Sequence, residues 1–358
     1  MSIFSRRTIL GFLLVSLIAI RFIPDGGEFY ATYIYPTTSW GLSFLSSLCP
    51  WSLEEITVCL TGALLLLFPL IGLCCRKGAK SILKGEIEIL LWVIVWFYWG
   101  WGCTYFRTPF HERMMIEEAE YTPESFQKFL TAYTDSLNAA YLPVQNLNKE
   151  EVRREIKAIY SQLPPGFGLT KPQSFQEPKT LLFNELYNQV GVLGYMGPFF
   201  AESQVNMSLE PLEYPFTYAH ELSHLLGISN EAEANFWAFH ICTQSKNPMV
   251  RYSAYNGLLA YVANNARAVF NKEDYEKWLA TVRPEVMEDE KRLAQLWKDR
   301  KNPVLNAAQD WLYNLYLKGN DIPQGVQNYA QVVSMLISVQ ESQQEPLRRQ
   351  GRALSVKQ

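Results

Sequence analysis

The chain has 358 residues, with 32 basic and 35 acidic side chains and a formal net charge of −3. Its average composition hides a split. Residues 8–105 carry 11 charged side chains in 98 positions, whereas residues 106–358 carry 54 in 253, of which 25 are basic and 29 acidic. The second part has no basic excess, so we expect no nucleic-acid partner. Wholesale disorder and a small disulfide-stapled fold are also excluded.

Three apolar segments in the first part have about the length that a helix needs to span a bilayer. They are residues 8–24, 56–75 and 87–106. The second segment has no charge and the third has only Glu88, while Arg21 near the end of the first can reach the interface. A cleaved signal is the alternative for the first segment, but no small-residue cleavage site follows it. We therefore expect residues 1–106 to form a membrane region with three transmembrane helices in the lipid bilayer.

The basic residues of the first part predict its orientation. Arg6 and Arg7 precede the first segment, the loop at 25–54 contains no Lys or Arg, and the loop at 76–86 contains four. Basic loops favour the cytoplasmic side. We therefore expect an integral protein of the bacterial cell membrane, with the N-terminus in the cytoplasm and everything after residue 106 outside it.

The second part reads as one mainly α domain with a small sheet, over residues 107–341, followed by a polar tail at 342–358. Apolar positions recur at helical spacing within 112–163 and again from Pro215 almost to residue 341. Residues 194–211 combine aromatic and β-branched residues with Gly and Pro at the borders, which predicts one or two short strands. The expected fold class is thus a helical transmembrane region joined to an α+β, mainly α, domain.

The motif that carries chemistry is HELSH, from His220 to His224. On a helix, residues four apart share a face, so the two imidazoles can bind one Zn²⁺ ion and Glu221 can hold the water that the metal activates. Pro215 suits a first helical turn and Gly227 a helix end. The alternative is a chance pattern on a surface helix. Against it, the chain has only four histidines, two of them here, and apolar neighbours surround the motif.

A catalytic zinc site usually has three protein ligands, and the third can be Glu231 or Glu233. Asn235 follows Glu231 by one helical turn and could hydrogen-bond a zinc ligand. With Asn230 as N-cap, Glu233 falls at the capping-box position instead. We favour Glu231 and keep Glu233 as the alternative ligand or, with Asn235, as a residue that supports the ligands. His240 is a further candidate on the following helix.

HELSH followed by NEAEANFWA resembles the gluzincin zinc metallopeptidases. The phrase ExEANxxA resembles the ImmA/IrrE-type minimal gluzincins and also the ExxAD helix of membrane HtpX-type peptidases. In both comparisons the first Glu is the metal ligand, which implies Glu231. Two features depart from these patterns. Asn235 replaces the Asp, and the seven residues from His224 to Glu231 are fewer than in most gluzincins.

The whole chain resembles a family of uncharacterised bacterial membrane proteins with three N-terminal spans and an HExxH, zincin-like domain. The shared stretches are EFYATYIYP, CPWSLEE, WGCTYFRTPFHERM, GPFFAESQVN, the HELSH region, RYSAY and YNLYLKGNDIPQGVQNY. The resemblance implies a membrane-anchored zinc metallopeptidase whose substrate is a peptide or protein, for example an envelope protein.

In this reading His220, His224 and Glu231 hold Zn²⁺, and Glu221 acts as general base on a zinc-activated water. The segment 197–206 is either a sheet edge that binds the substrate or a plain structural strand. An oxyanion donor is also needed, and Tyr252, Tyr255 and Tyr329 are candidates.

Two other functions remain open at this stage. One is a non-proteolytic zinc-binding membrane scaffold or envelope sensor that retains the zincin fold, although the intact Glu221 argues against it. The other is transport by the membrane helices, against which the scarcity of charges inside the predicted spans argues.

Overall fold

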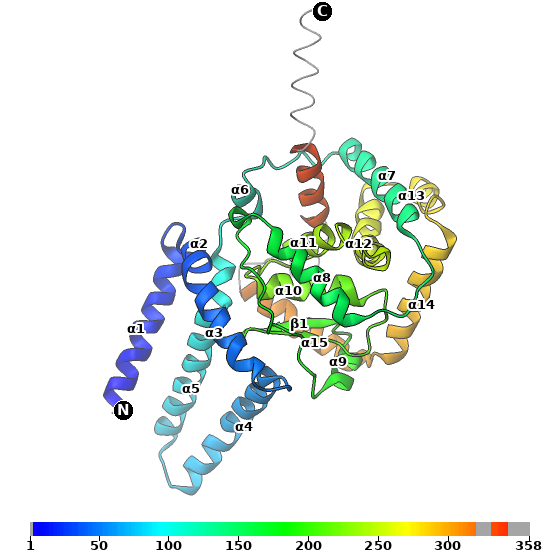
Figure 1. Ribbon diagram of the computed structural model, residues 1–358. Coiled ribbons are helices and arrows are strands. Elements are labelled where there is room, and N and C mark those ends of the chain that lie inside the picture. Colours follow the sequence, from blue (N-terminus) through cyan, green and yellow to red (C-terminus); the bar gives the residue numbers. More distant parts are fainter. Residues whose placement is uncertain (1–2, 320–330, 343–358) are drawn as a thin grey trace, which may run out of the picture.

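The structure is a computed structural model that describes residues 3–319 and 331–342. Its N-terminal helices project from one side of a mainly helical body (Figure 1). In chain order they are α1 (Ile3–Phe22), α2 (Gly26–Phe29), the π-helix η1 (Tyr30–Ile34), α3 (Tyr35–Ser47), α4 (Leu53–Cys74) and α5 (Ala79–Gly100). Helices α4 and α5 pack as an antiparallel hairpin, and α1 packs on α5. The ion pairs Arg6–Glu88 (2.7 Å) and Arg7–Glu88 (3.2 Å) join α1 to α5.

One helix among the described residues, α4, is long and apolar enough to cross a membrane by itself. A second crossing arises only if α1 is counted together with Gly26–Ser47, which it meets at 116°. The chain bends there at Asp25, a non-glycine residue with a φ of 58°. The structure thus has one candidate span, or up to two, in place of the three that the sequence predicted.

The predicted span at 87–106 does not qualify, for reasons of helix boundaries. Helix α5 begins at Ala79 and so includes the charged residues Lys84, Glu86 and Glu88. It ends at Gly100, and the 3₁₀-helix η2 (Gly102–Phe106) follows in place of a continuing helix. The apolar stretch and the helix therefore do not coincide.

The prediction of helix within 112–163 is confirmed for two long segments. These are α7 (Pro123–Ala140), which begins with a capping box formed by Thr122 and Ser125, and α8 (Lys149–Gln162), which Asn148 caps. The short helix α6 (Phe110–Met114) precedes them, and residues 115–122 and 141–148 lie outside helices. The short 3₁₀-helix η3 (Pro165–Phe167) follows α8.

The small sheet is also confirmed, with two antiparallel strands. Strand β1 (Gly194–Gly197) pairs with β2 (Glu202–Val205), so that Gly194 faces Val205 and Gly197 faces Glu202. On its other side β2 is bridged by Lys179, in a parallel sense. Within the described residues β1 is therefore the free edge. Of the two alternatives for residues 197–206, the described residues favour the plain structural strand, because β2 is bridged on its other side and is buried throughout.

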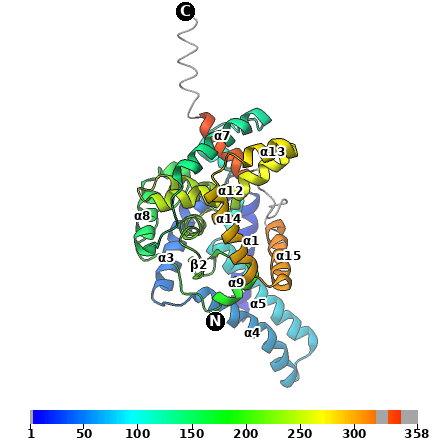
Figure 2. The same cartoon turned by 90° about the vertical axis from the view of Figure 1, so that its right-hand side faces the viewer.

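The remaining elements surround a central helix. They are α9 (Asn184–Val190), α10 (Tyr214–Leu225), α11 (Glu231–Thr243), α12 (Pro248–Val269), α13 (Lys272–Leu279), α14 (Pro284–Arg300) and α15 (Pro303–Gly319), and residues 331–342 are helical too. Helix α10 contacts α8, α11, α12 and both strands, and it lies within the helical body in Figure 1. In the view turned by 90°, α4 and α5 project from the lower end of this body (Figure 2). The predicted polar tail, except residue 342, lies outside the described residues.

Candidate metal centre

Helix α10 carries the HELSH motif through the centre of the body. Of its twelve residues, His220 is the one that is not buried. Each large apolar side chain buried in this way stabilises the fold by about 1.5–3 kcal/mol. Pro215 lies in the first turn, as its fixed φ favours. The helix is therefore held on nearly all sides, and it opens only at the first histidine of the motif.

Helix α11 follows after a short turn and begins at Glu231. The side chain of Asn230 accepts a hydrogen bond from the backbone N–H of Glu233 and so caps this helix. Gly227 in the turn has a φ of 105°, a conformation that residues with a side chain rarely adopt. The turn returns α11 along α10, which brings the start of the second helix to the end of the first.

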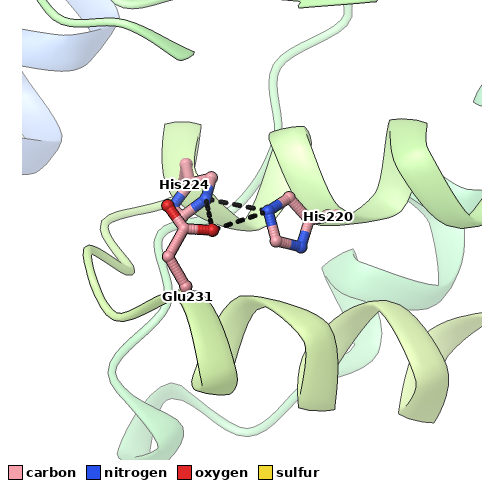
Figure 3. Close-up of side chains that lie close together, drawn as sticks. All are labelled: His220, His224 and Glu231. Carbon is pink, nitrogen blue, oxygen red and sulfur yellow. Dashed lines mark hydrogen bonds and ion pairs between the residues drawn. The ribbon is translucent and has the colours of Figure 1, made fainter. Parts of the chain in front are cut away.

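Three side-chain atoms converge where the two helices meet (Figure 3). The two Nε2 atoms of His220 and His224 lie 3.1 Å apart, and they lie 3.2 and 3.6 Å from Oε2 of Glu231. Donor atoms about 2.0–2.1 Å from a tetrahedral zinc ion would be about 3.3 Å from one another. The spacing of the cluster therefore fits three ligands of such an ion.

The hydrogen bonds of His224 fit the same role. Its Nδ1 lies 2.7 Å from the carbonyl oxygen of Ile228, which can only accept, so Nδ1 carries a proton. In the neutral ring Nε2 then presents a lone pair to the cluster, the arrangement found in metal-binding histidines. Lone pairs of two rings and a carboxylate at this spacing repel one another unless a proton or a cation lies among them.

The close approach of these groups shifts the pKa values of Glu231 and His224 in opposite directions. Burial alone would raise the pKa of the Glu231 carboxyl, but the positive charge of His224 and hydrogen bonds from both histidines lower it well below its ordinary value. Burial would lower the pKa of His224, yet the negative charge of Glu231 outweighs it and raises the pKa to about 9. Without a metal the cluster thus retains a proton, in the place that a divalent cation would take.

Glu221 lies next to His220 on α10, and its buried side chain faces strand β1. Burial, helped by the negative charge of Glu231 and opposed by the two histidines, raises the pKa of its carboxyl to about 7. Strand β1 approaches this side chain closely. A Cβ atom on Gly194 would lie 2.8 Å from Cγ of Glu221, so this position has room only for glycine. Such a carboxyl can take up and release a proton near neutral pH.

Glu233 lies outside the cluster. Both of its carboxylate oxygens accept hydrogen bonds from Nη2 of Arg113 at 2.5 Å, and one also accepts from Nε1 of Trp237 at 3.0 Å. The structure therefore brings Glu231, and not Glu233, to the two histidines. Asn235 is buried one turn after Glu231, and its hydrogen bond to a ligand stays a prediction.

The other residues singled out from the sequence have different surroundings. The His240 ring stacks on Phe236, with which it is nearly parallel. The Tyr252 hydroxyl donates to Asp289, and Tyr329 lies outside the described residues. No contact among the described residues selects an oxyanion donor from these tyrosines, and the assignment stays a prediction.

Side chains from the N-terminal helices hold the end of α10, which the sequence gave no reason to expect. The carbonyl group of His224 accepts from Nε1 of Trp101 at 2.9 Å, and that of Leu225 accepts from the Tyr35 hydroxyl at 2.8 Å. The carbonyl groups at a helix end lack partners within the helix, so these donors fix its position. The partners are 123 and 190 residues apart in sequence, and no local pattern predicts such pairs.

Arg107 adds further hydrogen bonds at the turn between α10 and α11. Its Nη1 donates to the carbonyl oxygens of Gly227 at 2.9 Å and Gly168 at 2.8 Å, while Nη2 pairs with Glu28 at 2.7 Å. The N-terminal region and the His/Glu cluster are thus parts of one packed structure.

Comparison with known proteins gives one family. The pattern of the family described as "Protein of unknown function (DUF3810)" matches residues 30–337. The chain belongs to this family. The matched region of the DUF3810 family includes α3–α5 as well as the His/Glu cluster. No curated protein and no solved structure matches the chain. The likeness of the HELSH region to zinc metallopeptidases therefore remains an interpretation of the motif.

Proposed function

We propose that the protein is a membrane-anchored zinc metallopeptidase. The observation that carries the proposal is the convergence of His220, His224 and Glu231 beside the buried carboxyl of Glu221. Three ligands of this type leave one tetrahedral position open, as catalytic zinc sites require and structural ones do not. The cluster is also reachable, since the side chains of His220 and Glu231 keep 14% and 35% of their surface exposed.

In this proposal His220, His224 and Glu231 would hold the metal. When bound, zinc supplies a Lewis acid that lowers the pKa of water towards neutrality and polarises a carbonyl group. Glu221 takes a proton from the attacking water and delivers it to the leaving amine, and its raised pKa suits both transfers. Ile228 holds the ring of His224 through its carbonyl oxygen, so that Nε2 keeps facing the site.

The open edge of β1 suits an extended peptide. Asn206 donates its backbone N–H to the carbonyl oxygen of Leu193, so the alternation of an antiparallel pair turns the backbone groups of Gly194 and Met196 outwards. Peptides add to such edges by main-chain hydrogen bonds. Because Gly194 touches Glu221, a strand added there would pass beside the carboxyl that handles the proton.

The membrane anchor in this proposal is the α4–α5 hairpin. Helix α4 has the length and apolarity of a span. Ser52 before α4 contacts the body, and α5 packs along α4 and leads the chain back to the body at Trp101. Four basic residues lie at the far end, between residues 76 and 84. By the positive-inside rule that end is cytoplasmic, and the metal site is outside the cell membrane.

The variant Glu221→Gln tests the proposal. Purified full-length protein would be incubated with a mixed-sequence peptide library, and new termini would be detected by mass spectrometry with zinc content measured in parallel. We expect the variant to keep its metal and lose hydrolysis by at least about 100-fold. Glu177→Gln, at an exposed ion pair, is the matched control and should remain active. Full activity in Glu221→Gln would refute the mechanism. Bound zinc without hydrolysis by the wild-type protein would favour the zinc-binding scaffold or sensor.

A further inference from the structure

We propose that the substrate is a polypeptide anchored in the same membrane, and that it is cut within about six extended residues of the bilayer surface. This inference rests on the proposed peptidase function and on α4 as the membrane span. It follows from two structural links that fix the distance between the metal cluster and the outer end of the α4–α5 hairpin.

The first link is direct and leads from the end of α5. Trp101 is the residue immediately after α5, and its indole N–H donates to the carbonyl oxygen of His224, one of the three cluster residues. The two rings also meet edge to face, with centroids 6.2 Å apart. One turn earlier on α5, the Trp96 indole donates to the carbonyl oxygen of Phe199 at 2.8 Å, in the turn between the two strands. The cluster therefore lies at the level where α5 ends.

The second link is strand β1, which joins the site to the first turn of α4. At one end, a Cβ atom on Gly194 would lie 2.8 Å from Glu221, and at the other, a Cβ atom on Gly197 would lie 2.7 Å from Glu54. Both ends of the strand thus touch a glutamate side chain, Glu221 at the site and Glu54 on the candidate membrane helix. Three residue steps of extended chain measure about 10 Å.

The start of α4 is bound firmly to the sheet, so this distance cannot change freely. Glu202 of β2 is buried and accepts hydrogen bonds from the backbone N–H groups of Leu53 and Glu54 at 2.9 and 3.1 Å. The hydroxyl groups of Ser46 and Ser52 donate to the same carboxylate at 2.6 and 3.0 Å. A carboxylate at a helix N-terminus is favoured by the free N–H groups and by the helix dipole.

Exposed apolar side chains surround this end of α4 and indicate the level of the membrane surface. Glu55 in the first turn accepts hydrogen bonds from the N–H groups of Leu182 and Phe183, at 2.6 and 3.2 Å. We use the name apolar collar for the exposed side chains Leu48, Trp51, Leu182, Phe183 and Leu186. Large apolar residues next to a span, with a Trp among them, are typical of the interfacial zone of a bilayer. The occupant that fits the apolar collar is the outer leaflet of the membrane that α4 spans.

These links set an upper limit on the height of the site. The strand contributes about 10 Å, and a side-chain contact at each end adds about 4 Å, so Glu221, the general base beside the cluster, lies less than about 20 Å above the first turn of α4 whatever the tilt of the strand. An extended chain covers that height in about six residues. A chain that leaves the bilayer beside the hairpin reaches the metal directly, whereas a distant loop of an anchored protein must fold back to do so.

The test uses full-length protein reconstituted with zinc in phospholipid vesicles and peptides with ten mixed-sequence positions. The peptides are supplied in three forms: free, joined at either terminus to a dipalmitoyl anchor, or joined to the same anchor through a twenty-residue Gly/Ser spacer. Two acyl chains give stable anchoring. The spacer form is the matched control, because it has the same concentration at the membrane and differs only in height. Mass spectrometry gives the rate and the position of each cut, with Glu221→Gln as background.

We expect the directly anchored peptides to be cut at least about ten times faster than the spacer form, with the cuts within about six residues of the anchor. Equal cutting of the direct and spacer forms, or cuts without positional preference, would overturn this inference while leaving the peptidase function standing. Absence of cutting above the Glu221→Gln background in all three forms would overturn both.

Discussion

The buried carboxylate of Glu202 is the link between the candidate span and the sheet, and Glu202→Gln is the sharpest test of it. One oxygen accepts from Ser46 and from the Leu53 N–H, and the other from Ser52, the Glu54 N–H and the Gln204 amide at 2.8 Å. A glutamine retains one oxygen and turns an NH₂ group towards the other set of donors. A serine hydroxyl can rotate and accept, but a backbone N–H cannot.

At least one buried N–H of the first turn of α4 therefore loses its partner in the variant, at a cost of about 1–3 kcal/mol. The loss of negative charge at the helix N-terminus adds about 0.5–1 kcal/mol. Removal of a buried charge offsets part of this, and we expect a net destabilisation of about 2–3 kcal/mol. Thermal unfolding in detergent should show a Tm lower by several degrees, and the amides of Leu53 and Glu54 should exchange hydrogen faster. Glu177→Gln, at an exposed pair, should shift the Tm by less than about 2 °C. A Glu202→Gln protein as stable as that control would refute the reasoning.

Three further predictions concern other parts of the structure. Tyr35→Phe and Trp101→Phe each remove a hydrogen-bond donor to the end of α10. Each variant should bind zinc about tenfold more weakly in a chelator competition. Unchanged zinc affinity in both variants would mean that these hydrogen bonds do not position the ligands. Burial raises the pKa of Glu290 to about 7. Between pH 4.5 and about pH 7, Glu290 is therefore more often protonated in the folded protein than in the unfolded chain. Protonation of Glu290 stabilises the fold fully at low pH, and this stabilisation is lost as the pH rises through about 7. Glu290→Gln should accordingly raise the Tm at pH 8 and leave it nearly unchanged at pH 5, and an equal shift at both would contradict the assignment. Arg113→Met leaves the buried Glu233 carboxylate without its cation, so we expect a loss of about 3–5 kcal/mol in chemical denaturation with zinc still bound. A loss below about 1 kcal/mol would show that the pair is dispensable.

The parts of the site that follow from local spacing could be predicted from the sequence. His220 and His224 are four residues apart on one helix, and the helix period alone predicts that their rings meet. Glu231 follows after a turn short enough that α11 must begin beside the end of α10. The choice of Glu231 over Glu233 agrees with the geometry because the third residue of a capped helix faces a different side from the first, and here it faces Arg113.

Features that depend on distant contacts could not be predicted in this way. The donors to the end of α10, Tyr35 and Trp101, come from segments that composition alone assigned to the membrane. The carboxylate of Glu202 has no sequence signal, because its partners lie some 150 residues away. The prediction of a span at 87–106 was also wrong, because the hydropathy of the side chains does not show where a helix begins and ends, and α5 covers Ala79–Gly100. The sequence left two alternatives for residues 197–206, a sheet edge or a structural strand, because the bridge from Lys179 to β2 leaves no mark in the local pattern.

The central claim is that His220, His224 and Glu231 form a zinc site, and metal content tests it most directly. Zinc would be measured by mass spectrometry in folded, full-length wild-type protein beside Glu231→Ala and Glu233→Gln, after dialysis against a weak chelator. We predict one zinc ion per chain in the wild type and in Glu233→Gln, and none in Glu231→Ala. Folded wild-type protein that binds no divalent metal, or Glu231→Ala that binds zinc as tightly as the wild type, would contradict the account.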